Sequence, residues 1–287
     1  MQQYRPNSFR ILPPVVKNLL IINTLVFLAT IALRKYNIDL INMFGLHYPG
    51  ASNFRIYQFF TYMFLHGGWM HILFNMFALW MFGNVVENVW GGKKFLIFYL
   101  LTGLGSAVVY LIWIHFTLSP NLNTLNQIIS HPTVAAVEDY FGKYGFRIGE
   151  INPLITQHDI SLFNQNMNLL SQGQANPDIM QQIVTFLSNY KIEMLNQMVV
   201  IGASGAIFGL LLAFGMMFPN SIIYLYFAIP IKAKWFVIGY GLLELFSGLN
   251  NRPGDNVAHF AHVGGMLVGL AIIFYWKKHG KFFGPEI

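Results

Sequence analysis

Two strongly apolar stretches of this chain carry a serine and a histidine, each beside a pair of glycines spaced four residues apart. Ser204 is the only polar residue of the stretch 198–218, and His262 lies in the last apolar stretch of the chain. The glycines are Gly205, Gly209, Gly265 and Gly269. Glycine pairs with this spacing let two membrane helices approach closely. Such an approach would join a hydroxyl to an imidazole, the nucleophile and base that covalent catalysis requires.

A third segment carries two further polar side chains that suit the same chemistry. His71 and Asn75 are spaced i, i+4, so they share one face of a helix. Both can donate hydrogen bonds to a tetrahedral oxyanion, together with the backbone N–H of Ser204 at a helix N-terminus. Asn75 could instead form a hydrogen bond between helices. We favour the oxyanion role because polar residues inside membranes are mostly functional.

These three segments resemble the motifs of the rhomboid family of intramembrane serine proteases. The matching sequences are HGGWMHILFN at 66–75, GASG at 202–205 and AHVGGMLVG at 261–269. The resemblance covers most of the chain but excludes roughly residues 118–196. It implies a Ser–His dyad without a metal or cofactor. It also implies a membrane-anchored protein substrate, cut near the outer end of its transmembrane helix.

The resemblance also implies roles for the residues around the dyad. His71 and Asn75 match the oxyanion positions of the family. His66 matches a histidine that braces a loop, and Glu87 matches a residue that anchors it, so both are expected to be structural.

Composition indicates a membrane protein. Of the 287 residues, 55% are apolar and only 10% are charged, whereas soluble domains contain about 25% charged residues. The pI of about 9.4 does not indicate nucleic-acid binding, because the basic residues lie mostly at the ends of apolar runs, as membrane orientation requires. The chain has no cysteine, which excludes disulfides, a thiol nucleophile and thiolate metal ligands.

The apolar stretches predict an all-α, six-transmembrane-helix bundle. The expected helices are 15–33, 69–87, 95–116, 204–218, 235–249 and 257–276. Residues 34–66 are expected to form a lateral, half-embedded loop. The helix that begins at Ser204 spans about 22 Å, short of the roughly 30 Å hydrocarbon core. The backbone before it should therefore be irregular and lie beside a water-filled cavity.

The stretch 118–196 differs in kind from the rest of the chain. It is rich in Asn and Gln and contains four prolines and more acidic than basic residues. We expect an inserted, mostly helical domain that faces water, between membrane-core segments 1–117 and 197–287. A disordered linker is the alternative.

No acidic residue is expected to complete a triad. Asp255 lies seven residues before His262, in a polar loop, and Glu244 lies in another apolar helix, where it needs a partner or water. His259 is expected to be an interfacial histidine. Phe208 lies one turn after Ser204 and either packs on the His262 ring or is a core aromatic.

Two other classes of function compete with the protease. A metal-binding or transport protein could use four histidines as ligands. They are His66, His71, His259 and His262. The chain contains no His-x-x-x-His unit, and no carboxylate is expected to orient these rings. An inactive, client-binding rhomboid-like protein is the other alternative, and the intact dyad and oxyanion residues argue against it.

Charge asymmetry predicts the orientation in the cell (inner) membrane. Ten of the 17 basic residues fall on the side of the termini, and three of the other seven lie in the long insertion, which the positive-inside rule discounts. A reporter fused after Ile287 should therefore read cytoplasmic, and one inserted near Gly173 should read external. Equal readings for both fusions would contradict the six-helix topology.

Overall fold

The computed structural model describes residues 10–146, 154–174, 176–225, 228–250, 258–280 and 282. This part of the chain is mostly helical and separates into two compact units. The first unit comprises Met1–Leu46, Tyr57–Tyr110 and Val200–Ile287, and the second comprises His47–Ile56 and Leu111–Val199.

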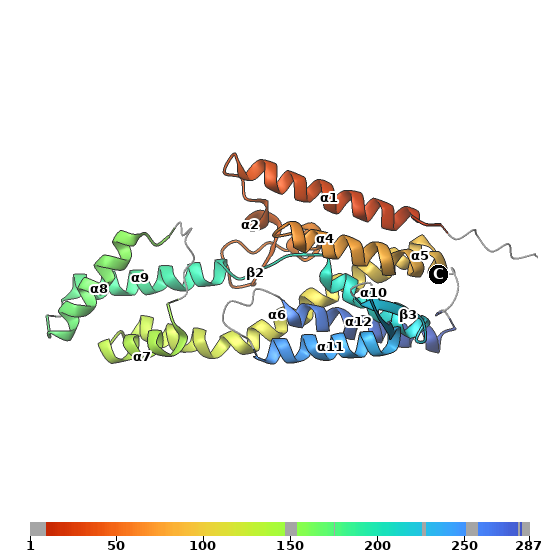
Figure 1. Ribbon diagram of the computed structural model, residues 1–287. Helices are drawn as coiled ribbons and strands as arrows, with labels where there is room; N and C mark the ends of the chain where they lie inside the picture. The colour runs from red at the N-terminus through yellow and green to blue at the C-terminus, as the bar shows by residue number, and fades with distance from the viewer. Residues whose placement is uncertain are drawn as a thin grey trace, which may run out of the picture. The chain divides into compact units, whose positions relative to one another are not determined.

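The first unit contains the helices that carry the candidate site residues (Figure 1). Its α-helices are α1 (Pro14–Arg34), α2 (Leu40–Phe44), α3 (Gln58–Thr61), α4 (Trp69–Ala78), α5 (Asn84–Trp90), the first half of α6 (Gly92–Ser130), α10 (Ser204–Met217), α11 (Ala233–Asn250) and α12 (His259–Lys278). The first unit also contains a 3₁₀ turn, η1 (Tyr62–Phe64), and a π-helical turn, η2 (Leu79–Gly83).

Four helical stretches of the described chain are long and apolar enough to cross a membrane. They are Pro14–Arg34, Trp69–Trp90, Gly92–Ser130 and His259–Lys278. The second stretch joins α4 and α5 through η2 without interruption. The apolar helix α10 is shorter. Together these helices identify a multi-pass membrane protein.

Helix α6 does not end near residue 116, so that predicted boundary was wrong. It continues as one helix to Ser130, with Pro120 inside it. The polar composition of 117–130 hid an apolar helical face, on which Leu118, Leu125 and Ile128 are buried. Their spacing is that of one face of a helix, and packing on this face outweighs the hydrogen bond that Pro120 cannot donate.

The prediction of an all-α fold was too narrow. Residues 221–232 contain an antiparallel hairpin, with β3 (Ile222–Leu225) paired to β4 (Ile229–Lys232) and Ile223 opposite Ile231. Branched isoleucines favour this pairing. Two shorter strands, β1 (Leu46–His47) and β2 (Val199–Val200), also occur.

The site helix α10 is the most enclosed element of the first unit. Ten of its residues are buried, on every face of the helix, as expected for a helix that is apolar all round. It packs against α11, α12 and η2. The backbone before it is not helical, and the N–H of Gly202 donates to the carbonyl oxygen of Tyr62 at 2.9 Å.

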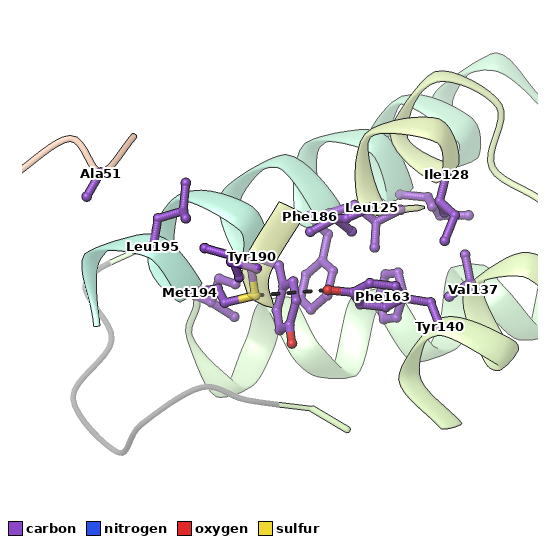
Figure 2. Close-up of a cluster of buried hydrophobic side chains, with 14 of the residues drawn as sticks. Ala51, Leu125, Ile128, Val137, Tyr140, Phe163, Phe186, Tyr190, Met194 and Leu195 are labelled. Carbon is purple, nitrogen blue, oxygen red and sulfur yellow. Dashed lines mark hydrogen bonds between the residues drawn. The ribbon is translucent and has the colours of Figure 1, made fainter. Parts of the chain in front are cut away.

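The second unit has a hydrophobic core of its own. Its helices are the end of α6, α7 (Val134–Tyr144), α8 (Gln157–Ser171) and α9 (Pro177–Asn196). Figure 2 shows Tyr140, Phe163, Phe186 and Tyr190 packed together. The ring centroids of Phe163 and Phe186 lie 4.1 Å apart in a stacked arrangement. Thr156 and Asp159 form a capping box at the start of α8. Most of the described residues of 118–196 thus lie in helices that pack on a shared core.

Candidate active site

Ser204 and His262 lie within hydrogen-bond distance of one another. The Oγ of Ser204 is 2.8 Å from the Nε2 of His262. Ser204 is the first residue of α10 and His262 lies in the first turn of α12, and both side chains are partly exposed. The serine hydroxyl is therefore placed to transfer its proton to the imidazole, and its backbone N–H is among those left free of intrahelical bonds.

Glycine contacts between α10 and α12 make this distance possible. A Cβ atom on Gly265 would overlap the carbonyl oxygen of Gly205. One turn along, a Cβ on Gly269 would lie 3.3 Å from the Cα of Gly209. Ser106 of α6 donates a hydrogen bond at 2.6 Å to the carbonyl of Ala261, the residue before His262. The backbones of the two helices thus touch directly where Ser204 and His262 meet.

Phe208 fixes the plane of the imidazole. Its ring stacks on that of His262, with 4.2 Å between centroids and 8° between planes. Tyr240 of α11 packs on Phe208 in turn, at 4.9 Å. Both alternatives for Phe208 are confirmed, because its ring contacts His262 and is also a buried member of a hydrophobic core cluster.

His71 and Asn75 of α4 both point toward the backbone just before Ser204. A Cβ on Gly202 would lie 2.7 Å from the Nε2 of His71 and 3.7 Å from the Nδ2 of Asn75. Gly202 has a φ of +121°, which an L side chain rarely adopts. Glycine at this position therefore leaves room for both polar groups beside Ser204.

The hydrogen bond that Nδ1 of His71 accepts indicates the tautomer of this ring. The N–H of Gly67 donates to Nδ1 of His71 at 3.4 Å, so a neutral ring carries its proton on Nε2 and can donate toward Gly202. The Nδ2 of Asn75 is buried without a hydrogen-bond partner among the described residues. A buried donor in this state favours a ligand that accepts a hydrogen bond.

His66 and Glu87 lie outside this arrangement. The His66 side chain is buried, and its ring meets the edge of His71 at 5.0 Å. Glu87 accepts hydrogen bonds from the N–H groups of Val15 and Val16, at 3.0 and 2.7 Å. Its observed contact is thus with the N-terminus of α1, where an anion is stabilised by the helix dipole.

The expectation that no carboxylate approaches His262 was wrong. The Oε2 of Glu244, in α11, lies 2.8 Å from Nδ1 of His262 and 2.6 Å from Nδ1 of His259. His259 is therefore more than an interfacial histidine. Asp255, the acid weighed from the sequence, lies outside the described residues.

The signal for this contact was present in the sequence but incomplete. A glutamate in an apolar helix needs a partner, yet nothing in the spacing between Glu244 and His262 identifies the helices as neighbours. The contact also bears on the alternative of a metal-binding protein, because a carboxylate now lies beside two of the histidines. The ligand atoms of Glu244, His259 and His262 all lie within 4.8 Å of one another, close enough to hold a cation.

The chain belongs to the rhomboid family. A family model described as "Rhomboid domain" matches residues 53–119 and 178–279, more than half of the chain. The matched segments include every candidate catalytic and oxyanion residue described above. This finding confirms the resemblance inferred from the three motifs, and the unmatched stretch 120–177 falls within the second unit.

Curated relatives share shorter segments with this chain. Rhomboid-like protein 15 of Arabidopsis thaliana is 36% identical over 61 residues, which is 21% of this chain and 15% of the relative. Rhomboid-like protein 11, chloroplastic, of the same organism is 42% identical over 53 residues, 18% of this chain and 19% of the relative. Rhomboid protease GlpG of Salmonella newport is 36% identical over 56 residues, 20% of each chain. The chain thus aligns with a fifth or less of the length of each relative.

The glycine contacts predict a graded response to added methyl groups. Gly265→Ala forces α10 and α12 apart, because the new Cβ meets backbone that cannot rotate away. Overpacking of this kind costs typically 1–3 kcal/mol. We expect a lower melting temperature and loss of activity for Gly265→Ala, and a smaller effect for Gly269→Ala, whose contact is looser.

Gly239→Ala is the matched control in α11, since nothing lies within 4 Å of its added Cβ. This variant should melt at or above the wild-type temperature, because alanine favours a helix over glycine by about 1 kcal/mol. Equal melting temperatures and activities for Gly265→Ala and Gly239→Ala would contradict the helix contact.

Proposed function

We propose that this protein is an intramembrane serine endopeptidase that hydrolyses peptide bonds in or near transmembrane segments of membrane proteins. The observation that carries the proposal is the 2.8 Å contact between Ser204 Oγ and His262 Nε2 at the N-terminus of an enclosed helix. Family membership supports it, since GlpG of Salmonella newport bears the name rhomboid protease.

The first half of the reaction forms an acyl-enzyme. Ser204 Oγ attacks the carbonyl carbon of the scissile bond as its proton passes to Nε2 of His262. The carbonyl oxygen becomes an oxyanion that accepts hydrogen bonds from the backbone N–H of Ser204, from His71 and from Asn75. The intermediate then collapses, the C–N bond breaks, and His262 gives the proton to the leaving amine.

The second half repeats these steps with water as the nucleophile. His262 takes a proton from the water, whose oxygen bonds to the acyl carbon. Collapse of this second intermediate breaks the ester bond and returns the proton to Ser204. In this scheme no metal or cofactor takes part.

The membrane arrangement completes the proposal. The four long apolar helices, together with α10 and α11, form six spans with both termini in the cytoplasm of a cell (inner) membrane. The second unit and the Ser204 end of α10 then lie on the outer side. A substrate helix enters from the lipid bilayer, and water reaches the nucleophile from the outer side.

Substitutions at the four proposed catalytic residues should lower cleavage activity by different amounts. Ser204→Ala and His262→Ala should each abolish cleavage of a purified model transmembrane substrate, and the double variant should be no worse, because members of one catalytic unit are non-additive. His71→Ala or Asn75→Ala should each lower kcat by about 10²–10³-fold, the usual loss for a single oxyanion donor.

Ser221→Ala is the control, since Ser221 is exposed just beyond α10 and should leave activity unchanged. Chelators should have no effect on cleavage. A metal protein would give the opposite pattern, with Ser204→Ala tolerated and chelation damaging. Full activity of purified Ser204→Ala would refute the serine protease.

A further inference from the structure

The carboxylate of Glu244 lies between two histidine rings at the contact of α11 and α12. One oxygen, Oε2, is shared by Nδ1 of His259 and Nδ1 of His262, at 2.6 and 2.8 Å. The Glu244 side chain is only 5% exposed, and those of His259 and His262 are 12% and 11% exposed. A buried carboxylate is costly unless its charge is compensated. Two N–H groups that donate to one oxygen provide this compensation for Glu244.

Close packing of α11 on α12 holds this carboxylate in place. Gly241, Glu244 and Gly248 lie on one face of α11, since they are spaced i, i+3 and i+7. A Cβ on Gly248 would lie 3.1 Å from Cβ of His259, and one on Gly241 would lie 3.2 Å from the sulfur of Met266. The glycines on either side of Glu244 thus let α12 approach until its histidines reach the carboxylate.

The distances fit hydrogen bonds better than metal coordination. Two atoms that each lie about 2.0–2.1 Å from a tetrahedral Zn²⁺ are roughly 3.3 Å apart. The observed separations of 2.6 and 2.8 Å are those of N–H···O⁻ bonds. Nδ1 of His262 therefore carries a proton toward Glu244, which leaves the lone pair of Nε2 directed at Ser204.

We propose that Glu244 is a positioning residue that converts the Ser204–His262 pair into a Glu–His–Ser triad, with His259 as the second donor that holds Glu244. The inference rests on the proposed protease function and departs from the dyad expected from the sequence. The carboxylate stays ionised throughout. It fixes the productive tautomer of His262 and stabilises the imidazolium that forms when Nε2 takes the serine proton.

Glu244→Gln tests this assignment, because it keeps the shape of the side chain and removes the charge. We expect kcat to fall by about 10²–10⁴-fold, in the range up to that seen when a triad carboxylate is neutralised, with KM and melting temperature near wild type. Glu193→Gln is the matched control. Glu193 is a buried glutamate of α9, 3% exposed and distant in sequence from the site, and its substitution should leave kcat unchanged. A loss of less than tenfold for Glu244→Gln would overturn the proposal.

A second measurement needs no variant at Glu244. ¹⁵N NMR of the wild-type protein labelled at histidine, with His262 assigned by comparison with His262→Ala, should show Nδ1 protonated and Nε2 unprotonated. The opposite tautomer would overturn the proposal even if Glu244→Gln fails to fold.

At the second donor, His259→Asn should stay within about threefold of wild type, since its amide N–H can replace Nδ1–H, while His259→Ala should lose about tenfold. Equal activities of these two variants would remove His259 from the assignment.

Three outcomes distinguish the alternatives. If ZnCl₂ binds the wild-type protein with one ion per chain, inhibits it, and fails to bind Glu244→Gln, the three residues form a metal site and the triad is wrong. If Ser204→Ala retains activity, the protease itself is wrong. Full activity in Glu244→Gln with none in Ser204→Ala would contradict only the triad.

Discussion

The direct contact of α10 with α12 is the constraint on which the site depends. Because Gly265 has no side chain, the backbone of α12 touches that of α10 at the carbonyl of Gly205, and the hydroxyl of Ser204 reaches Nε2 of His262 at 2.8 Å. A catalytic group misplaced by about 1 Å can cost on the order of 10² in rate. Glycine at position 265 is therefore required for the packing of α12 on α10, and the proposed chemistry depends on it as well.

The imidazole of His262 is held from three directions once that contact exists. Ser204 meets one nitrogen, Glu244 meets the other, and the ring of Phe208 covers one face. Each contact comes from α10 or α11, so the position of the imidazole depends on elements other than its own helix. The shared carboxylate also explains how a glutamate is accommodated in an apolar helix, since His259 and His262 supply its hydrogen bonds.

Features that depend on neighbouring residues in the sequence were predicted well. Contacts between helices were predicted less well. Ser204, His262 and their glycines were identified because small and polar residues are conspicuous in apolar helices. Glu244 was equally conspicuous, but its partner could not be identified, since pairing of α11 with α12 depends on tertiary packing. The continuation of α6 to Ser130 was missed because a polar composition masked one buried face, and the hairpin β3–β4 was missed because a short apolar run carries no clear period.

Covalent labelling of the purified, full-length protein by a serine-directed fluorophosphonate, mapped by peptide mass spectrometry, tests the central claim most directly. A nucleophile activated by His262 should give one adduct per chain on Ser204, and neither Ser204→Ala nor His262→Ala should be labelled. Unlabelled wild-type protein that still cleaves a transmembrane substrate, or an adduct on another serine that abolishes cleavage, would contradict the account.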